Sequence, residues 1–218
     1  MSKLIRFALL GCAAVVLSAA TARADSIGPT CATCQGSIYT LDNLGLVADL
    51  YPADNLFDTY RIMLTIDTSG YTGGGVRIDE VAVKVSSAVS AAKLVDAPGG
   101  AALWQLVPGG LNANGCSGSG SGFECSDWIV GSLGGAVIPG PLLRWVFDVD
   151  ISGGLLAGTN QASIKARYVD TNNVKVGALV SEAITLGPPT TQVPEPATAA
   201  LLGLGLAFAV AGRRRLGV

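Results

Sequence analysis

The segment Leu143-Arg-Trp-Val-Phe-Asp-Val-Asp-Ile151 gives the clearest indication of the fold, because large apolar residues occupy every second position along it. The positions between them include Arg144, Asp148 and Asp150. Successive side chains of a β-strand point to opposite faces of the sheet, so this alternation indicates one buried and one solvated face. We therefore expect a half-buried strand over Leu142–Ile151, with Trp145 on its apolar face.

The same alternation recurs along the chain. It is clear over Asp58–Asp67, Val76–Val85 and Gln161–Asp170. Weaker strand candidates are Gly36–Leu50, Leu94–Val95, Ala102–Val107, Trp128–Val130 and Val174–Leu186. Turn-forming clusters separate the strands, at Ser69-Gly70, Gly73–Gly75, Pro98–Gly100, Pro108–Gly110, Ser152–Gly154 and Thr171–Asn173. About eight short strands in this pattern predict an all-β fold, an antiparallel β-sandwich over residues 25–187.

The composition agrees with a glycine-turned β domain and excludes several functions. Charged residues make up 14% of the chain, hydrophobic residues 50%, and there are 29 glycines. Asp25–Gln192 holds 8 basic and 15 acidic residues, a net charge of −7, which argues against nucleic acid as a partner. The chain has no histidine, which removes Ser-His-Asp and Cys-His nucleophiles and imidazole metal sites. We assign no catalytic residue, no cofactor and no metal ligand.

The N-terminus has the pattern of a secretory signal peptide at residues 1–24. Lys3 and Arg6 precede an apolar stretch of about eleven residues, and small residues follow it up to Ala24. The stretch is too short to span a bilayer comfortably, which takes about 20 residues. We place the cleavage between Ala24 and Asp25. The alternatives are an uncleaved anchor helix and a lipoprotein site at Cys12.

The C-terminus has three successive parts. A proline-containing linker at residues 188–192 leads into Val193-Pro194-Glu195-Pro196. Residues 197–212 carry no charge and would form a transmembrane helix about 24 Å long, slightly shorter than the hydrocarbon core. Arg213, Arg214 and Arg215 then form a cluster that the positive-inside tendency keeps in the cytoplasm. The prolines hold the segment before the helix extended at the membrane surface, where a protease could bind it.

These three parts together resemble a PEP-CTERM sorting signal, over residues 193–218. In that family the signal is recognised by an exosortase, a membrane-embedded cysteine transpeptidase-like enzyme of Gram-negative bacteria that make exopolysaccharide. The resemblance implies that Val193, Pro194, Glu195 and Pro196 are recognition residues for processing. The alternative is a plain tail anchor behind a proline-rich linker.

Four cysteines remain once the leader is removed. Because they would lie in an oxidising compartment, we expect two disulfides, Cys31–Cys34 and Cys116–Cys125, each close in sequence. The second would close the flexible run at residues 117–122, which adds about 2.5 kcal/mol of stability. A Cys₄ zinc site and a redox-active Cys-x-x-Cys pair are the alternatives.

Two carboxylates and two tryptophans are the remaining candidates. Asp148 and Asp150 lie two residues apart on a strand, so we place both on its solvent face, where a plain polar surface is the simplest interpretation. The pair could also serve a glycan hydrolase or bind calcium, with loop oxygens from Asp67, Thr68 or Asn172. Trp104 and Trp128 flank the Cys116–Cys125 loop and are candidate glycan contacts. Core packing is the alternative for both.

The sequence thus predicts a non-enzymatic protein of the cell envelope or extracellular matrix, structural or adhesive and associated with exopolysaccharide. The alternatives are a carbohydrate-binding module and a small carboxylate-based glycan hydrolase. The expected partners are the export translocon, signal peptidase, an exosortase-type transpeptidase and exopolysaccharide. The expected route is export, an intermediate tethered to the inner membrane and facing the periplasm, and then the cell surface or the extracellular space.

Overall fold

A computed structural model describes residues 26–186, except 29, 55, 57, 113, 132–133, 141, 157–158 and 178–181, and except the side chains of residues 117–119 and 182. The signal peptide at residues 1–24, the linker at 188–192 and the sorting segment at 193–218 were predicted from sequence and lie outside the described residues.

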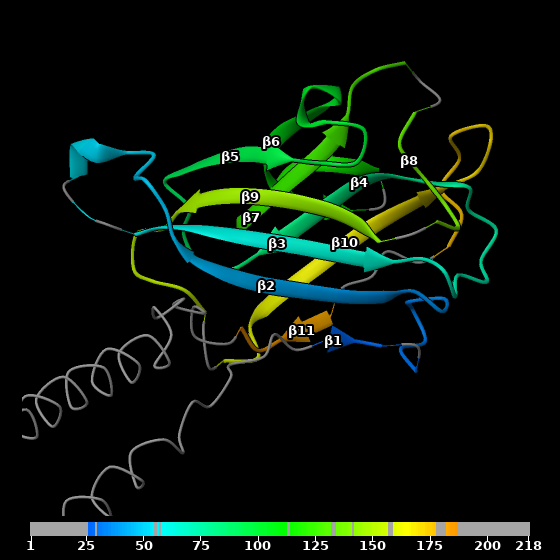
Figure 1. Cartoon of the computed structure of the whole chain (residues 1–218), viewed down its shortest axis with the longest axis horizontal. Coiled ribbons are helices and arrows are strands. Elements are labelled where there is room, and N and C mark those ends of the chain that lie inside the picture. The colour runs from blue at the N-terminus through cyan, green and yellow to red at the C-terminus, as the bar shows by residue number, and fades with distance from the viewer. Residues whose placement is uncertain are drawn as a thin grey trace, which may run out of the picture.

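Two antiparallel sheets make up the described part of the chain (Figure 1). The first sheet has the strand order β1-β2-β3-β9-β5. Its strands are β1 (Ser26–Ile27), β2 (Ile38–Leu46), β3 (Thr59–Asp67), β9 (Leu143–Asp150) and β5 (Ala91–Asp96). Strand β9, which contains the stretch that predicted the fold, is paired on both sides, with β3 and β5.

The second sheet has the order β11-β10-β4-β7-β6, and β8 adds a short pairing to β4. Its strands are β11 (Glu182–Ile184), β10 (Ala162–Val169), β4 (Arg77–Lys84), β7 (Gly115–Trp128), β6 (Trp104–Asn112) and β8 (Ala136–Val137). The first sheet crosses in front of the second in Figure 1. The sheets meet at both edges, since β1 lies beside β11 and β5 beside β6.

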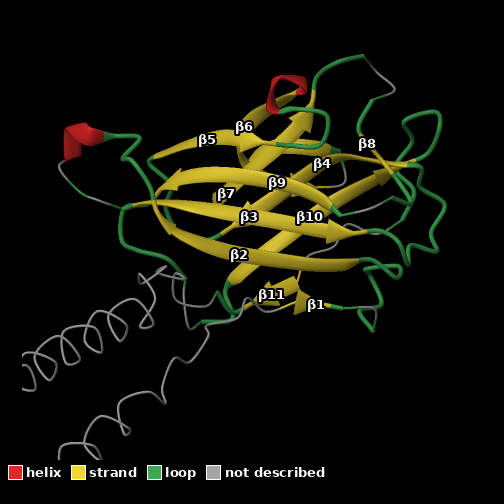
Figure 2. Ribbon diagram, viewed as in Figure 1, coloured by secondary structure: helices red, strands yellow, loops and turns green. Residues whose placement is uncertain are grey.

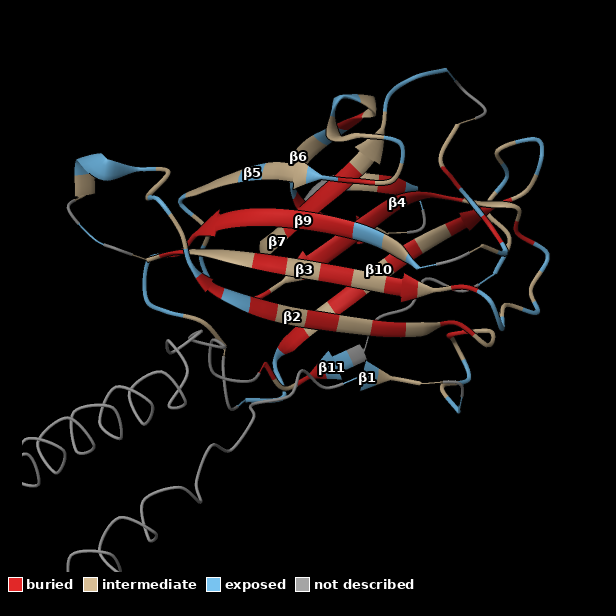
Figure 3. Ribbon diagram, viewed as in Figure 1, coloured by how far each residue is buried: buried red, intermediate tan, exposed pale blue. Residues whose placement is uncertain are grey.

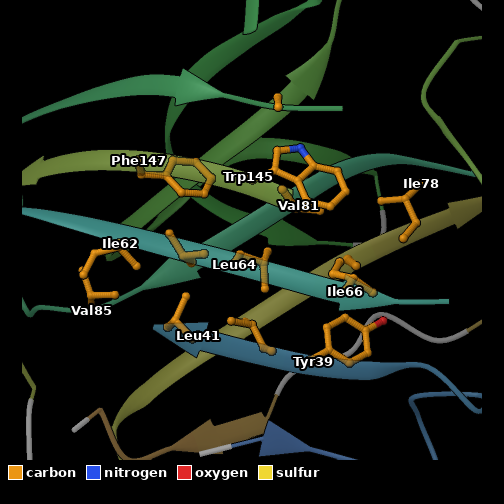
Figure 4. Close-up of a cluster of buried hydrophobic side chains, with 14 of the residues drawn as sticks. Tyr39, Leu41, Ile62, Leu64, Ile66, Ile78, Val81, Val85, Trp145 and Phe147 are labelled. Atoms are coloured by element: carbon orange, nitrogen blue, oxygen red, sulfur yellow. The ribbon is translucent and has the colours of Figure 1, made fainter. Parts of the chain in front are cut away.

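One hydrophobic cluster fills the space between the sheets (Figures 3 and 4). On the first sheet, the cross-strand row Leu41, Leu64 and Trp145 is almost completely buried. On the second sheet, Val81 and Ala166 face each other on β4 and β10 and are equally buried. Burial of such apolar surface is the main driving force for folding. The alternation in the sequence therefore reports which face of each strand meets the core.

Three buried hydroxyl groups cross this core at one end. Tyr168 of β10 donates a hydrogen bond to Ser37 Oγ at 2.9 Å, and its hydroxyl also meets that of Tyr39 on β2. The ring of Tyr71 stacks on Tyr168 with centroids 4.7 Å apart. The two sheets are thereby joined by polar as well as apolar contacts, and each buried hydroxyl is satisfied.

Helical structure in the described residues is limited to two short 3₁₀ segments, η1 (Pro52–Asp54) and η2 (Ala101–Leu103) (Figure 2). In this part of the chain no helix is long and apolar enough to cross a membrane. The spanning helix predicted at residues 197–212 lies outside it.

The region around β6 and β7 differs from the sequence prediction. Pro108–Gly110 was expected to be a turn and lies within β6, and Trp128–Val130 was expected to be a strand although β7 ends at Trp128. The run at residues 117–122, expected to be a flexible loop, belongs to β7. Between Cys116 and Cys125 this strand holds several more residues than the facing part of β6, so it bulges while keeping its pairing.

Candidate functional site

The two tryptophans proposed as glycan contacts do not form a sugar-stacking platform. Trp104 is only 4% exposed, its ring meets those of Trp128 and Trp145 edge to face, and its Nε1 donates to the Pro98 carbonyl at 2.9 Å. Trp104 therefore belongs to the core, which corrects its assignment as a glycan contact. Trp128 is half-buried and donates from Nε1 to the Val130 carbonyl at 2.5 Å, so its assignment as a glycan contact is neither corrected nor established by its position.

Both predicted disulfides are confirmed. Cys31 is bonded to Cys34 with Cα atoms 5.2 Å apart, and Cys116 to Cys125 with Cα atoms 5.8 Å apart. Cys34 belongs to the hydrophobic cluster between the two sheets, whereas Cys125 belongs to a separate small cluster on the other face of the second sheet. A shared Cys₄ zinc site is thus wrong for this structure.

Asp148 was expected on a solvated surface, and the structure shows it buried. Its carboxylate accepts two hydrogen bonds from Arg61, from Nε at 2.7 Å and from Nη2 at 2.8 Å. The register of β3 and β9 places the two residues directly opposite each other. Because the guanidinium occupies both oxygens of Asp148 in a bidentate pair, this carboxylate is structural.

Asp150 was also expected to face solvent, and its side chain has no exposed surface. Its Oδ2 accepts a hydrogen bond from Thr59 Oγ1 at 3.0 Å, across the last pair of β3 and β9. Its Oδ1 is buried and has no hydrogen-bond donor. Burial, more than any other effect, raises the pKa of Asp150, and the charges of Asp58 and Asp54 act in the same direction.

Two further aspartates come close to Asp150 from the loop that joins β2 to β3. Carboxylate oxygens of Asp49, Asp58 and Asp150 all lie within 4.8 Å of one another. We call these three residues the acidic cluster. Thr59 holds the loop in place, since its carbonyl accepts from Val47 N at 3.0 Å and its Oγ1 accepts from Leu50 N at 3.0 Å.

The sequence analysis identified Asp150 but chose the wrong companions for it. Asp67 lies at the far end of β3, where its Oδ1 accepts from Ser69 N at 2.9 Å. The sequence analysis did not consider strand pairing. In an antiparallel pair the start of one strand lies beside the end of the other, so the residues just before β3 lie close to the last residues of β9. Asp58 immediately precedes β3, and Asp49 begins the same loop.

A second polar group lies on the other sheet. Arg167 of β10 binds Asp79 through Nε at 3.0 Å and through Nη2, and its Nη2 is 2.9 Å from Glu80 Oε1. Burial raises the pKa of Glu80 to about 7, while Arg167 opposes the shift. Glu124 of β7 also has a pKa raised to about 7, by burial. Two carboxyl groups on this sheet therefore change charge near neutral pH.

The described part of the chain is thus a disulfide-bonded all-β domain of two antiparallel sheets, with a tail that follows β11. Residues 192–215 of that tail match the family model of the PEP-CTERM protein-sorting motif. The match confirms the resemblance drawn from the prolines, the uncharged stretch and the arginine cluster. A chain with this motif is an exported protein that an exosortase processes at the membrane. No curated protein and no solved structure matches the chain.

Proposed function

We propose that the chain is a structural or adhesive protein of the cell envelope or extracellular matrix that associates with exopolysaccharide. The match of residues 192–215 to the sorting motif carries this proposal. In this account the leader at residues 1–24 directs export, residues 197–212 hold the chain in the inner membrane, and exosortase processing then releases the β domain to the surface. The two disulfides support an oxidising destination.

The recognition step is tested by replacing Pro194 and Pro196 with alanine in an exosortase-positive host. The matched control replaces Pro188 and Pro189 with alanine, because these prolines lie in the same tail but before residue 192. We expect the first variant to remain unprocessed in the membrane fraction, while the control is processed like the natural chain. Equal processing of both variants, measured by intact mass, would contradict a sorting role for these prolines.

A carbohydrate-binding module is the second candidate, favoured by one observation. Next to the half-buried Trp128 ring lie Ile129 and Val130, which are 48% and 50% exposed. A half-buried aromatic residue beside exposed apolar side chains can offer part of its ring face for stacking against a sugar ring. Saturable binding to exopolysaccharide that is lost in Trp128→Ala would support this candidate, with Val137→Ala, which removes a side chain that is 70% exposed, as the control.

We propose no catalytic activity for the β domain. The Asp148 and Asp150 pair suggested a glycan hydrolase, but both oxygens of Asp148 accept hydrogen bonds from Arg61. A general acid needs a carboxyl group free to exchange its proton with substrate. Hydrolysis of exopolysaccharide that disappears in Asp148→Asn, with the fold intact, would refute this proposal.

A further inference from the structure

The acidic cluster lies where the end of β9 meets the loop between β2 and β3, at the left of Figure 1 beside η1. Asp150 comes from the strand, and Asp49 and Asp58 come from the two ends of the loop. Asp49 and Asp150 are 101 positions apart in the sequence, and the antiparallel pairing of β3 with β9 brings them together. The cluster is therefore a product of the fold and is not a local run of acidic residues.

The buried oxygens of this cluster lack the donors that a carboxylate needs. Oδ1 of Asp150 and Oδ1 of Asp58 are both inaccessible to solvent and accept no hydrogen bond. The three ion pairs found among the described residues join Arg61 to Asp148 and Arg167 to Asp79 and Glu80, so none of them neutralises the acidic cluster. A buried charge without a donor or counter-ion is strongly unfavourable, so the arrangement needs a cation or a proton.

We propose that Asp49, Asp58 and Asp150 bind a calcium ion. Oxygens that bind one Ca²⁺ at its usual distances of about 2.3–2.6 Å lie at most about 5 Å apart, which agrees with the 4.8 Å limit of the cluster. The set contains only oxygen donors, which suits Ca²⁺ and Mg²⁺ and disfavours zinc and copper. The chain has no histidine, and its four described cysteines are bonded in pairs.

Calcium fits this position better than magnesium. Mg²⁺ requires nearly ideal octahedral geometry and retains several waters, whereas Ca²⁺ accepts irregular sets of six to eight oxygens. Here one ligand comes from a strand and two come from an irregular loop, and Thr59 Oγ1 adds a neutral oxygen 3.0 Å from Asp150 Oδ2. The exterior of a cell also supplies calcium at concentrations that weak sites of extracellular modules use, with dissociation constants of about 10⁻⁴–10⁻³ M.

The ion would fasten the β2–β3 loop to the end of β9. Asp150 is covered by this loop, and the loop itself exposes Tyr51 and Leu56, each 51% exposed. Tyr51 N donates to Asp49 Oδ1 at 2.9 Å, so a ligand residue also shapes the exposed part of the loop. Calcium would therefore set the conformation of one apolar surface of the delivered domain. This inference does not depend on tail processing.

The test compares thermal unfolding of the chain, purified in detergent from the host envelope, in 10 mM CaCl₂, in 10 mM MgCl₂ and in EDTA. With a dissociation constant near 10⁻⁴ M, calcium is in about 100-fold excess, and we expect the midpoint to rise by about 5–10 °C over EDTA. Magnesium should give less than half of that rise. Titration calorimetry should show one ion bound per chain.

Asp58→Asn is the informative variant, and Asp67→Asn, at the other end of β3, is its matched control. We expect Asp58→Asn to lose the calcium-dependent rise and to unfold in EDTA at an equal or higher temperature than the natural chain, because it removes repulsion between carboxylates. Asp67→Asn should keep the full rise. If Asp58→Asn does not fold, Asp49→Asn serves in its place.

Three results would overturn the proposal. The first is equal stability of the natural chain in calcium and in EDTA, which, if stability also rises at acidic pH, indicates a proton shared between Asp49 and Asp150. The second is an undiminished calcium response in the variants of the acidic cluster. The third is an equal response to magnesium.

Discussion

Replacing Glu124 with glutamine should make the β domain more stable at alkaline pH and flatten its pH dependence. Glu124 lies on β7 directly opposite Val83 of β4, so it points to the same inner face as that buried valine. The residue is only 6% exposed, and burial raises its pKa from 4.5 to about 7. The charged form is therefore the unfavourable one in the folded state.

The sign of the effect follows from proton linkage. Between about pH 4.5 and pH 7 the folded state holds a proton that the unfolded state has released, so the free energy of unfolding falls as pH rises through this range. The rise of the pKa from 4.5 to about 7, at about 1.4 kcal/mol for each pH unit, gives an upper limit of about 3.5 kcal/mol. Since β7 is next to the edge strand β6, and a buried amide needs partners of its own, we expect Glu124→Gln to gain about 1–3 kcal/mol at pH 8.

Urea unfolding at pH 5, 6, 7 and 8 measures this prediction, with the dependence on denaturant checked for constancy between the variants. Glu80 contributes a slope of the same sign, so the difference between the natural chain and the variant isolates Glu124. Asp67→Asn is the control, because its carboxylate lies at the end of β3 on the other sheet, where it accepts a hydrogen bond from Ser69 N at 2.9 Å. Parallel pH profiles for Glu124→Gln and the natural chain, or a loss of stability in the variant at pH 8, would refute the reasoning.

Arg61→Ala leaves a buried carboxylate without its bidentate partner and should lower the free energy of unfolding by about 1.5–3 kcal/mol at neutral pH in chemical denaturation. Removal of the Cys116–Cys125 bond by paired alanine substitution should cost about 2.5 kcal/mol by loop entropy, seen as a lower unfolding midpoint than that of the natural chain when both are measured without reductant. Trp104→Ala should cost about 3–5 kcal/mol and Trp128→Ala less than half as much, because Trp104 is buried and Trp128 is only half-buried; equal losses would contradict the assignment of Trp104 to the core.

Sequence periodicity predicted the strands whose two faces differ most. Strands β3, β4, β9 and β10 begin and end within two residues of the predicted segments, because each has one face in the core and one face outside it. The same reasoning failed for β7. Its Ser-Gly run has no side-chain pattern, and its pairing to β6 depends on backbone hydrogen bonds. On its other side, Gly122 allows a close approach to the chain just after β4, since a Cβ there would lie 2.0 Å from the Ser86 carbonyl oxygen.

The acidic cluster and the Arg61–Asp148 pair could not be predicted from local pattern, for a related reason. Alternation correctly assigns Asp148 and Asp150 to the outer face of β9. It does not show that this face is exposed to solvent, and the sequence analysis assumed that it was. Partners 87 and 91 residues away, on β3, cover that face in this fold. Only the strand order identifies such partners. The tail, by contrast, could be predicted from sequence alone, because its motif is defined by the type and order of neighbouring residues. Residues 192–215 match the PEP-CTERM protein-sorting motif, as expected.

The neighbouring positions of β1 and β11 determine how the domain would respond to a pull. While the chain is still held in the membrane, before processing, a pull on the tail would reach the domain at the edge where β1 and β11 lie, opposite the edge formed by β5 and β6. Tension along the chain would act first on two strands of only two and three residues, and not on the long central strands. We expect them to detach early and lengthen the tether, which would absorb mechanical load while the Trp145 core stays folded.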